Sequence, residues 1–209
     1  MVGAGRTGTW SALEPYAVTP DFQIFGKGIA GGYAPLSAMV TSRRILDVIA
    51  EKSGAPLHNQ TFSQFPISCA AGLATIRQLK AEGLIERCAR MGEVLQRSLG
   101  ELLDHPNVGD VRGRGLFAGV EFVADKASRE PFDPSLGMAE TFTLAAQAAG
   151  LVVWPNSGYT EQGNGDLVLI GPPFIITESE ISELLELFRD ALEMAINTVY
   201  DRMGHQRPI

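Results

Sequence analysis

A glycine-rich loop that contains one lysine, directly after a short apolar run, constrains this chain more than any other feature. Residues 22–25 (Phe-Gln-Ile-Phe) predict a buried strand, and Lys27 follows it between two glycines. Gly31 and Gly32 come shortly afterwards, and glycines let a bulky ligand approach the backbone. A lysine at the end of a buried strand and beside such a loop is expected to be desolvated. Desolvation favours the neutral, nucleophilic amine over the charged ammonium. The structural alternative is a lysine that ends a surface loop.

The composition is that of an ordinary globular protein. Of the 209 residues, 45% are hydrophobic and 20% are charged, which supports a sizeable core. The formal net charge is −7, and the 17 lysines and arginines form no basic stripe, so we expect neither nucleic-acid nor membrane partners. The chain shows no apolar run of membrane-spanning length and no signal-peptide pattern, which favours a cytoplasmic location.

The cysteines and histidines lack the spacing of a metal site. Cys69 and Cys88 lie in apolar helical patterns, and both are predicted to be reduced thiols in the core. His58, His105 and His205 are far apart in the sequence. We therefore expect no metal ion.

Hydrophobic periodicity divides the remaining chain into helices and short strands. Helices are predicted from residue 42, over 66–80, from residue 85, over 138–149, and from a Thr177–Glu180 capping box towards residue 199. Strands are predicted at 36–41, in a hairpin over 108–123, at 151–154 and at 167–170. A break at Gly83 predicts a boundary between a first domain, residues 1–82, and a second, residues 83–209.

Residues Gly3–Gly8 match the G-x-G-x-x-G pattern of dinucleotide-binding loops, but not its context. Such a loop follows a strand and opens a helix, whereas Pro15 and Pro20 interrupt the stretch that follows here. A glycine-rich turn is the better prediction. A nucleotide-binding module that uses Gly3–Gly8 remains a distant alternative.

Two other polar features have both a structural and a functional interpretation. Thr61 is expected either to cap the helix that follows it or to donate its hydroxyl to a phosphate. Arg112 and Arg114 frame a glycine turn, and we expect them to pair with Asp110 or Glu121 rather than to bind an anion.

In order and spacing, these motifs resemble those of the class III, fold-type I, pyridoxal-phosphate-dependent aminotransferases. The resemblance runs from residue 1 to about residue 195. It rests on Gly5–Gly8, Pro20–Asp21, Gly26–Pro35, Thr61–Phe62 with Pro66, Arg112–Gly115, and Pro172–Pro173 with Ile176–Glu178. The resemblance implies an α/β, aspartate aminotransferase-like fold. Residues 1–82 would be the C-terminal part of the large, cofactor-binding domain, and residues 83–209 an α+β small domain.

The family resemblance also implies a reaction and a cofactor. Lys27 is implied as the lysine that forms a Schiff base with pyridoxal 5′-phosphate and then moves a proton. Thr61 is implied as a ligand of the cofactor phosphate, usually in the neighbouring subunit's site, which implies a homodimer. The activity would be transfer of an amino group from an amine or amino acid donor to a keto acid or aldehyde.

The sequence departs from the family pattern in three places. Phe65 replaces a common histidine, which we expect to affect packing more than catalysis. Residues 167–170 lack the arginine with which several members bind an α-carboxylate, which favours an amine or ω-amino-acid donor. The acidic run that pairs with the cofactor's ring nitrogen precedes the matching segment in the family and is not in this sequence. An inactive fragment is therefore the alternative to an active transaminase, and we expect no turnover by the isolated 209-residue chain.

Overall fold

The computed structural model describes residues 4–54 and 60–204, which form two compact units. Unit 1 comprises residues 1–87 and unit 2 residues 88–209. The domain assignment made from the sequence, 1–82 and 83–209, stays a prediction. Gly3, His58 and His205, named above, lie outside the described residues.

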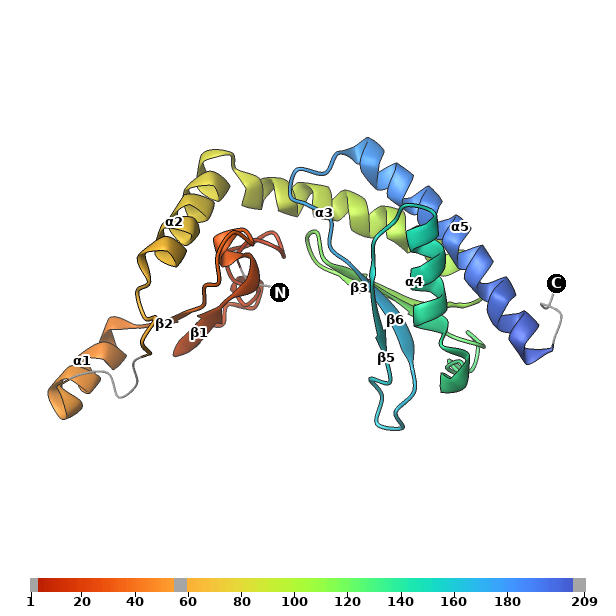
Figure 1. Cartoon of the computed structure of the whole chain (residues 1–209), viewed down its shortest axis with the longest axis horizontal. Coiled ribbons are helices and arrows are strands. Elements are labelled where there is room, and N and C mark those ends of the chain that lie inside the picture. Colours follow the sequence, from red (N-terminus) through yellow and green to blue (C-terminus); the bar gives the residue numbers. More distant parts are fainter. Residues whose placement is uncertain (1–3, 55–59, 205–209) are drawn as a thin grey trace. The chain divides into compact units, whose positions relative to one another are not determined.

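Unit 1 is organised around one pair of antiparallel strands, drawn in red and orange in Figure 1. Phe22 lies opposite Thr41, and Phe25 lies opposite Ala38. The elements, in chain order, are η1 (Glu14–Tyr16), β1 (Phe22–Phe25), η2 (Lys27–Ala30), β2 (Ala38–Thr41), α1 (Arg43–Ser53) and α2 (Pro66–Ala81). The strands and helices predicted for this region are therefore confirmed. α1 buries none of its residues.

Small residues let α2 pack closely on the loop that follows β1. Its buried residues are Ser68, Gly72 and Leu79, which recur on one face of the helix. A Cβ atom at Gly72 would lie 2.4 Å from the Cδ2 atom of Leu36, so the missing side chain permits this approach. The prediction that Cys69 is a core thiol is wrong, because Cys69 lies off this face and is exposed.

Unit 2 is an α+β unit with one antiparallel sheet of four strands in the order β3-β4-β6-β5. Its elements, in chain order, are α3 (Leu84–Gly100, which begins at the end of unit 1), η3 (Glu101–Asp104), β3 (Val108–Gly113), β4 (Ala118–Phe122), η4 (Pro134–Leu136), α4 (Met138–Ala148), β5 (Trp154–Ser157), β6 (Asp166–Ile170) and α5 (Glu178–Met203). The predicted 108–123 hairpin and the capping box that begins α5 are confirmed.

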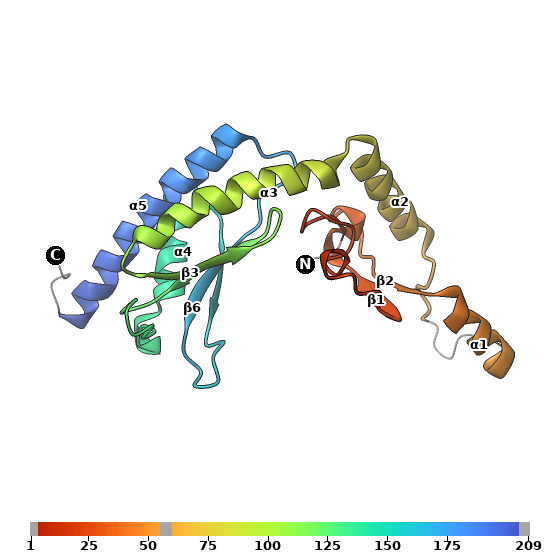
Figure 2. The same cartoon turned by 180° about the vertical axis from the view of Figure 1, so that it is seen from behind.

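Alternation along β4 defines the core of unit 2. Ala118, Val120 and Phe122 are buried on one face of the sheet, because successive strand residues point to opposite sides. The Phe122 ring lies 5.0 Å from that of Phe142 on α4 and 6.4 Å from that of Phe188 on α5. Figures 1 and 2 show α4 and α5 running beside the sheet. The two helices therefore cover the apolar face.

The strand predicted at residues 151–154 begins later, so this prediction is wrong in its bounds. The Leu151 N–H donates to the Ala146 carbonyl at the end of α4, and Leu151 and Val153 are buried. These residues therefore belong to the connection that leaves the helix. Pairing with β6 starts only at Trp154, which lies opposite Leu169.

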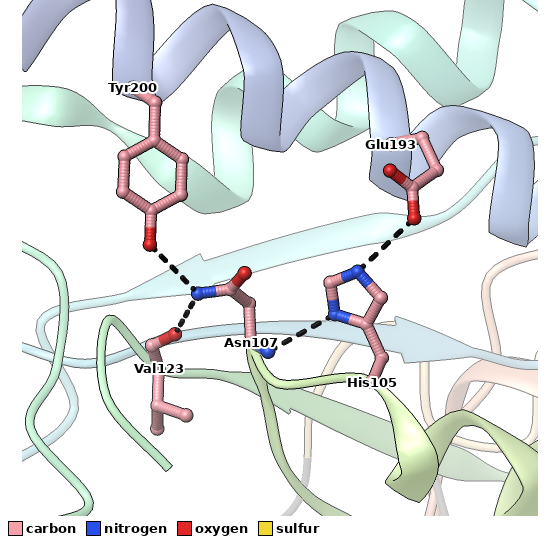
Figure 3. Close-up of polar contacts among 5 residues, drawn as sticks. All are labelled: His105, Asn107, Val123, Glu193 and Tyr200. Atoms are coloured by element: carbon pink, nitrogen blue, oxygen red, sulfur yellow. Dashed lines mark hydrogen bonds and ion pairs between the residues drawn. The ribbon is translucent and has the colours of Figure 1, made fainter. Parts of the chain in front are cut away.

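A buried amide joins the start of β3 to α5 (Figure 3). The Asn107 side-chain nitrogen donates to the Val123 carbonyl at 3.0 Å and lies 3.4 Å from the Tyr200 hydroxyl. The Asn107 backbone N–H donates to Nδ1 of His105, whose Nε2 lies 3.3 Å from a Glu193 carboxylate oxygen. His105 thus serves the fold, with its two ring nitrogens facing different partners.

Candidate active site

Lys27 follows β1 in a backbone conformation that is uncommon for a lysine. Gly26 continues the extended chain, and Lys27 then turns with φ of 50°, in the left-handed region. Gly31 and Gly32, with φ of 62° and 81°, end the short helix η2. Non-glycine residues in this region are costly and tend to occur at functional sites.

A cavity of about 890 Å³ opens beside Lys27. Its lining combines one amine, several hydroxyl and amide groups, one thiol and a few apolar side chains. The lining residues are Lys27, Ala34, Pro35, Leu36, Ser37, Gln60, Phe62, Ser63, Gln64, Phe65, Ser68 and Cys69. Its size falls in the range of small-molecule sites. The lysine loop and the segment before α2 therefore share one cavity within unit 1.

The cavity has a second strained residue that sequence reasoning did not identify. Gln64 has φ of 60° and lines the same cavity as Lys27, although the two residues are far apart in the sequence. The Ser63 hydroxyl accepts a hydrogen bond from the Gln60 backbone N–H at 3.0 Å, and the Phe65 N–H donates to the Phe62 carbonyl. These turns fix the segment that carries Gln64. No sequence pattern distinguishes such a glutamine from one in any polar loop.

The expected desolvation of Lys27 is not found in the described chain. Lys27 is exposed, and the strand before it, predicted as buried, has alternating exposed and half-buried residues. The reason is that β1 pairs only with β2 among the described residues. A strand in a two-stranded sheet keeps much of its surface in water.

Thr61 lies in the segment that lines the cavity, but its own side chain is exposed and is not among the lining groups. Its neighbours Gln60 and Phe62 both are. The cap of α2 is Phe65, which makes no side-chain capping bond. The helix-capping interpretation of Thr61 is therefore wrong.

The remaining candidate groups have structural roles. Arg112 pairs with Glu121 at 2.8 Å and with Asp110, as predicted. The hydrogen bonds that the Arg112 guanidinium donates to Glu121 and then to Asp110 raise the pKa of Arg112. In the opening loop, the Gly8 N–H donates to the Gly5 carbonyl, and turns follow instead of a helix. This geometry does not fit a dinucleotide loop, so the nucleotide-binding alternative is not supported.

Comparison with known proteins identifies the family of this chain. The family model of Aminotransferase class-III matches residues 1–192 of this chain. The chain belongs to this family. The fold class inferred from the class-III motifs is thus confirmed as part of a fold-type I transaminase.

Several aminotransferases and solved transaminase structures are similar to this chain. An uncharacterized aminotransferase of Schizosaccharomyces pombe is 43% identical over 187 residues, which cover 89% of this chain and 41% of that protein. Taurine–pyruvate aminotransferase of Bilophila wadsworthia is 36% identical, over 98% of this chain and 44% of its own length. An (S)-enantioselective omega-transaminase from Thermomicrobium roseum has a TM-score of 0.85 at 35% identity, over 93% of this chain and 42% of that structure.

The chain thus spans about two fifths of the length of the curated relatives it matches. More than half of each relative has no counterpart in the present sequence. No helix within residues 4–54 and 60–204 is long and apolar enough to cross a membrane.

Proposed function

We propose that this chain supplies the lysine-bearing part of a pyridoxal-phosphate-dependent transaminase. The enzyme moves an amino group from an amine or amino acid donor to a keto acid or aldehyde. Lys27 is the residue that holds the cofactor covalently, and Thr61 is a ligand of its phosphate. The observation that carries the proposal is the strained Lys27 at the wall of a polar cavity of about 890 Å³.

The groups around the cavity suit a small aromatic molecule that carries a phosphate. α2 begins at Pro66, and its first-turn residues Ser68 and Cys69 line the cavity. The first turn of a helix leaves backbone N–H groups without partners inside the helix, and the helix dipole favours an anion there. The Ser37 and Ser63 hydroxyls add further donors, and Phe65 offers an apolar ring. This donor set fits pyridoxal 5′-phosphate.

Thr61 supports a site shared between two copies of the chain. Its exposed hydroxyl lies outside the cavity that its neighbours line, so it is available to a second molecule. We therefore propose a homodimer in which Thr61 of one protomer donates to the phosphate held by its partner. The Thr61 hydroxyl is a suitable phosphate ligand because it donates without carrying charge.

Lys27 would act twice in the reaction. Its amine would hold the cofactor, and the free amine would move a proton to and from the substrate carbon. When bound, pyridoxal 5′-phosphate supplies an electron sink for the negative charge that develops there. The left-handed backbone at Lys27 fixes the origin of its long side chain.

The proposed class of amino donor follows from the absence of an arginine in one strand. Residues Asp166–Ile170 form β6, and their sequence contains no arginine that could bind an α-carboxylate. We therefore propose that amines or ω-amino acids are better donors than α-amino acids. Several similar structures are described as omega-transaminases, which agrees with this proposal.

A fusion protein tests the proposed function. The polypeptide that precedes the matched region in the Bilophila wadsworthia enzyme is joined ahead of residue 1, and pyruvate is offered with an amine, an ω-amino acid or an α-amino acid. We expect transamination with the first two donors. K27A should lower the rate at least about a hundredfold, whereas K126A, on a loop of unit 2, should not change it. Full activity of K27A, or a preference for α-amino acids, would contradict the respective part of the proposal.

One observation favours the second candidate, an inactive fragment, for the isolated chain. Lys27 is exposed in the described structure, and the strand that precedes it is only partly covered. We therefore expect the 209-residue chain alone to show no turnover with any of the three donor classes. Turnover by the isolated chain would overturn this expectation.

A further inference from the structure

We infer that Cys69 is a covalent modification site that selects small carboxylates with an electrophilic carbon. The cavity beside Lys27 attracts the carboxylate of such a molecule, and the Cys69 sulfur then attacks its electrophilic carbon. The site lies in the cavity of the proposed function. The inference needs only this cavity and its charge, and it does not depend on the cofactor or on transamination.

Cys69 combines access to solvent with a place in the cavity wall. It is exposed and lines the cavity, whereas Cys88, the other cysteine of the chain, is 0% exposed and lies in the core cluster of unit 2. The Cys69 backbone N–H donates to the Phe65 carbonyl at 3.0 Å, so the first turn of α2 holds the residue in place. Buried structural cysteines are inert, and accessible ones react. Cys69 is therefore the thiol that an electrophile reaches first.

The charge of the cavity lining favours an anion. Lys27 contributes a formal positive charge, and no aspartate or glutamate is among the described residues that line the cavity. The side-chain amides of Gln60 and Gln64 and the hydroxyls of Ser37 and Ser63 line it as well, and these groups can donate hydrogen bonds. A cleft whose charge has one sign raises the local concentration of small molecules of the opposite sign. The cavity therefore favours a carboxylate over a neutral molecule of the same size.

An unused hydroxyl beside Cys69 in the chain offers the anion a further donor. Ser68 is 6% exposed and lines the cavity, yet its hydroxyl makes no hydrogen bond to any residue that the structure describes. Hydroxyl groups of buried residues usually have a partner. Within the described residues, no fully covered side-chain oxygen lacks a partner, so the Ser68 hydroxyl retains open space, and the cavity is the space that it lines. Ser68 can thus donate to an anion in the cavity that Cys69 also lines.

The chemical step needs no reactant besides the electrophile. The Cys69 sulfur forms a bond to the electrophilic carbon while the bond from that carbon to its leaving group breaks. With iodoacetate, iodide departs with the electron pair and the thiol proton passes to water. The product is a thioether that carries a carboxylate, and nothing is oxidised or reduced by a further reagent.

Two alkylating reagents of similar size test the inference in the 209-residue chain. Iodoacetate is anionic and iodoacetamide is neutral, and mass mapping of the labelled peptides gives the rate at each cysteine. The measured quantity is the iodoacetate rate divided by the iodoacetamide rate. At Cys69 of the folded chain, we expect this ratio to be at least about tenfold higher than at the same cysteine in urea. Inorganic phosphate should lower the ratio more than chloride at equal ionic strength, because phosphate competes for the same donors.

Two lysine substitutions locate the source of the preference. K27Q removes the formal charge from the cavity lining, whereas K52Q removes the charge of an exposed lysine of α1 that does not line the cavity. K27Q should bring the ratio at Cys69 close to its value in urea, and K52Q should leave it unchanged. Cys88 should stay unlabelled in every folded variant, which reports that unit 2 is intact.

Three results would overturn the inference: an equal ratio at Cys69 in the folded chain and in urea, an unreactive Cys69 in the folded chain, or a high ratio that K27Q leaves in place. The last result would show that the selectivity arises outside this cavity. Because no cofactor or amino donor is present in these reactions, their failure is distinguishable from a failure of the proposed transaminase function.

Discussion

At the scale of single residues, Asp166 is a carboxyl group that folding places where its charge is disfavoured. It is 3% exposed, and its Oδ1 accepts the Ala139 N–H at 3.0 Å near the start of α4. Burial raises the pKa of Asp166, the Ala139 N–H lowers it in part, and the charge of Glu140 raises it further. The net direction is upward, so the folded protein holds the Asp166 proton at pH values where the unfolded chain has lost it.

This shift predicts how Asp166 contributes to stability as the pH changes. Its contribution to the free energy of unfolding is greatest below the unfolded pKa and is lost as the pH rises through the raised, folded value. D166N keeps an oxygen for the Ala139 N–H but cannot ionise. We therefore expect D166N to be at least as stable as the original protein at pH 7 and relatively less stable at pH 4.

Urea unfolding at several pH values measures this difference. Hydrogen bonds from neighbouring residues lower the pKa values of Asp125 and Asp133, so these two groups have the opposite pH dependence. Because both groups are present in D166N and in the original protein, their contributions cancel in the difference between the two stabilities. D166A, which removes the acceptor, should lose about 1–3 kcal/mol at either pH. A difference between D166N and the original protein that does not vary with pH would contradict the account.

At the scale of elements, the contact between α3 and the β3–β4 turn depends on a glycine in the helix. A Cβ atom at Gly92 would lie 2.4 Å from the Cα atom of Gly115, which is backbone and cannot swing aside. Gly100, at the end of the same helix, has no atom within 4 Å of the corresponding position. Alanine substitutions at Gly92 and Gly100 therefore compare a position in close backbone contact with an open position of the same helix.

G92A should destabilise unit 2, and G100A should not. Alanine is the better helix former by about 1 kcal/mol, so G100A should be neutral or slightly stabilising. At Gly92 the backbone contact must open, which we expect to cost about 1–3 kcal/mol in spite of that gain. Thermal unfolding of both variants measures the difference. Equal melting temperatures would show that α3 does not depend on this close approach.

Much of the element order could be predicted from the sequence, because periodicity and caps act locally. Thr177 with Glu180 marks the start of α5 in the structure, as the capping box predicts. The buried face of α2 was not predictable in the same way, because its members Ser68 and Gly72 carry no hydrophobic signal. The start of β5 was missed because Leu151 is apolar whether it pairs in a sheet or connects to it.

At the scale of the whole molecule, the two units differ in the apolar surface that they bury. The core cluster runs through α3, the sheet, α4 and α5 and includes the mutually tilted rings of Phe122, Phe142 and Phe188. Unit 1 has no comparable cluster among its described residues. Local stability should follow this division, since opening is easiest where few apolar contacts are lost.

Limited proteolysis of the isolated chain should therefore cut unit 1 first. Trypsin is expected to cleave after exposed residues such as Lys27 and Lys52 and to leave a resistant fragment that contains β3 to α5. In the fusion protein, the sites in unit 1 should become resistant as well. Equal rates of cleavage in both units of the isolated chain would contradict the difference in stability.

The candidate site could be predicted only in part, because it depends on how distant segments of the chain pack together. Lys27 could be proposed as a candidate from the apolar run and the glycines that surround it in sequence, and its role then followed from the family resemblance. Gln64 and Ser68 could not, because their place beside Lys27 depends on how α2 returns to the strand pair. The exposure of Lys27 could not be predicted either, because it depends on which strands flank β1.

The central claim is that Lys27 holds the cofactor covalently. It is tested most directly by treating the fusion protein with equimolar pyridoxal 5′-phosphate, reducing the lysine–carbonyl linkage with borohydride and mapping the modified peptides by mass spectrometry. The account predicts that the peptide with Lys27 carries most of the modification and that K27A abolishes it there without transferring it to Lys52, Lys80 or Lys126. Modification spread evenly over the lysines, or concentrated on another one, would contradict it.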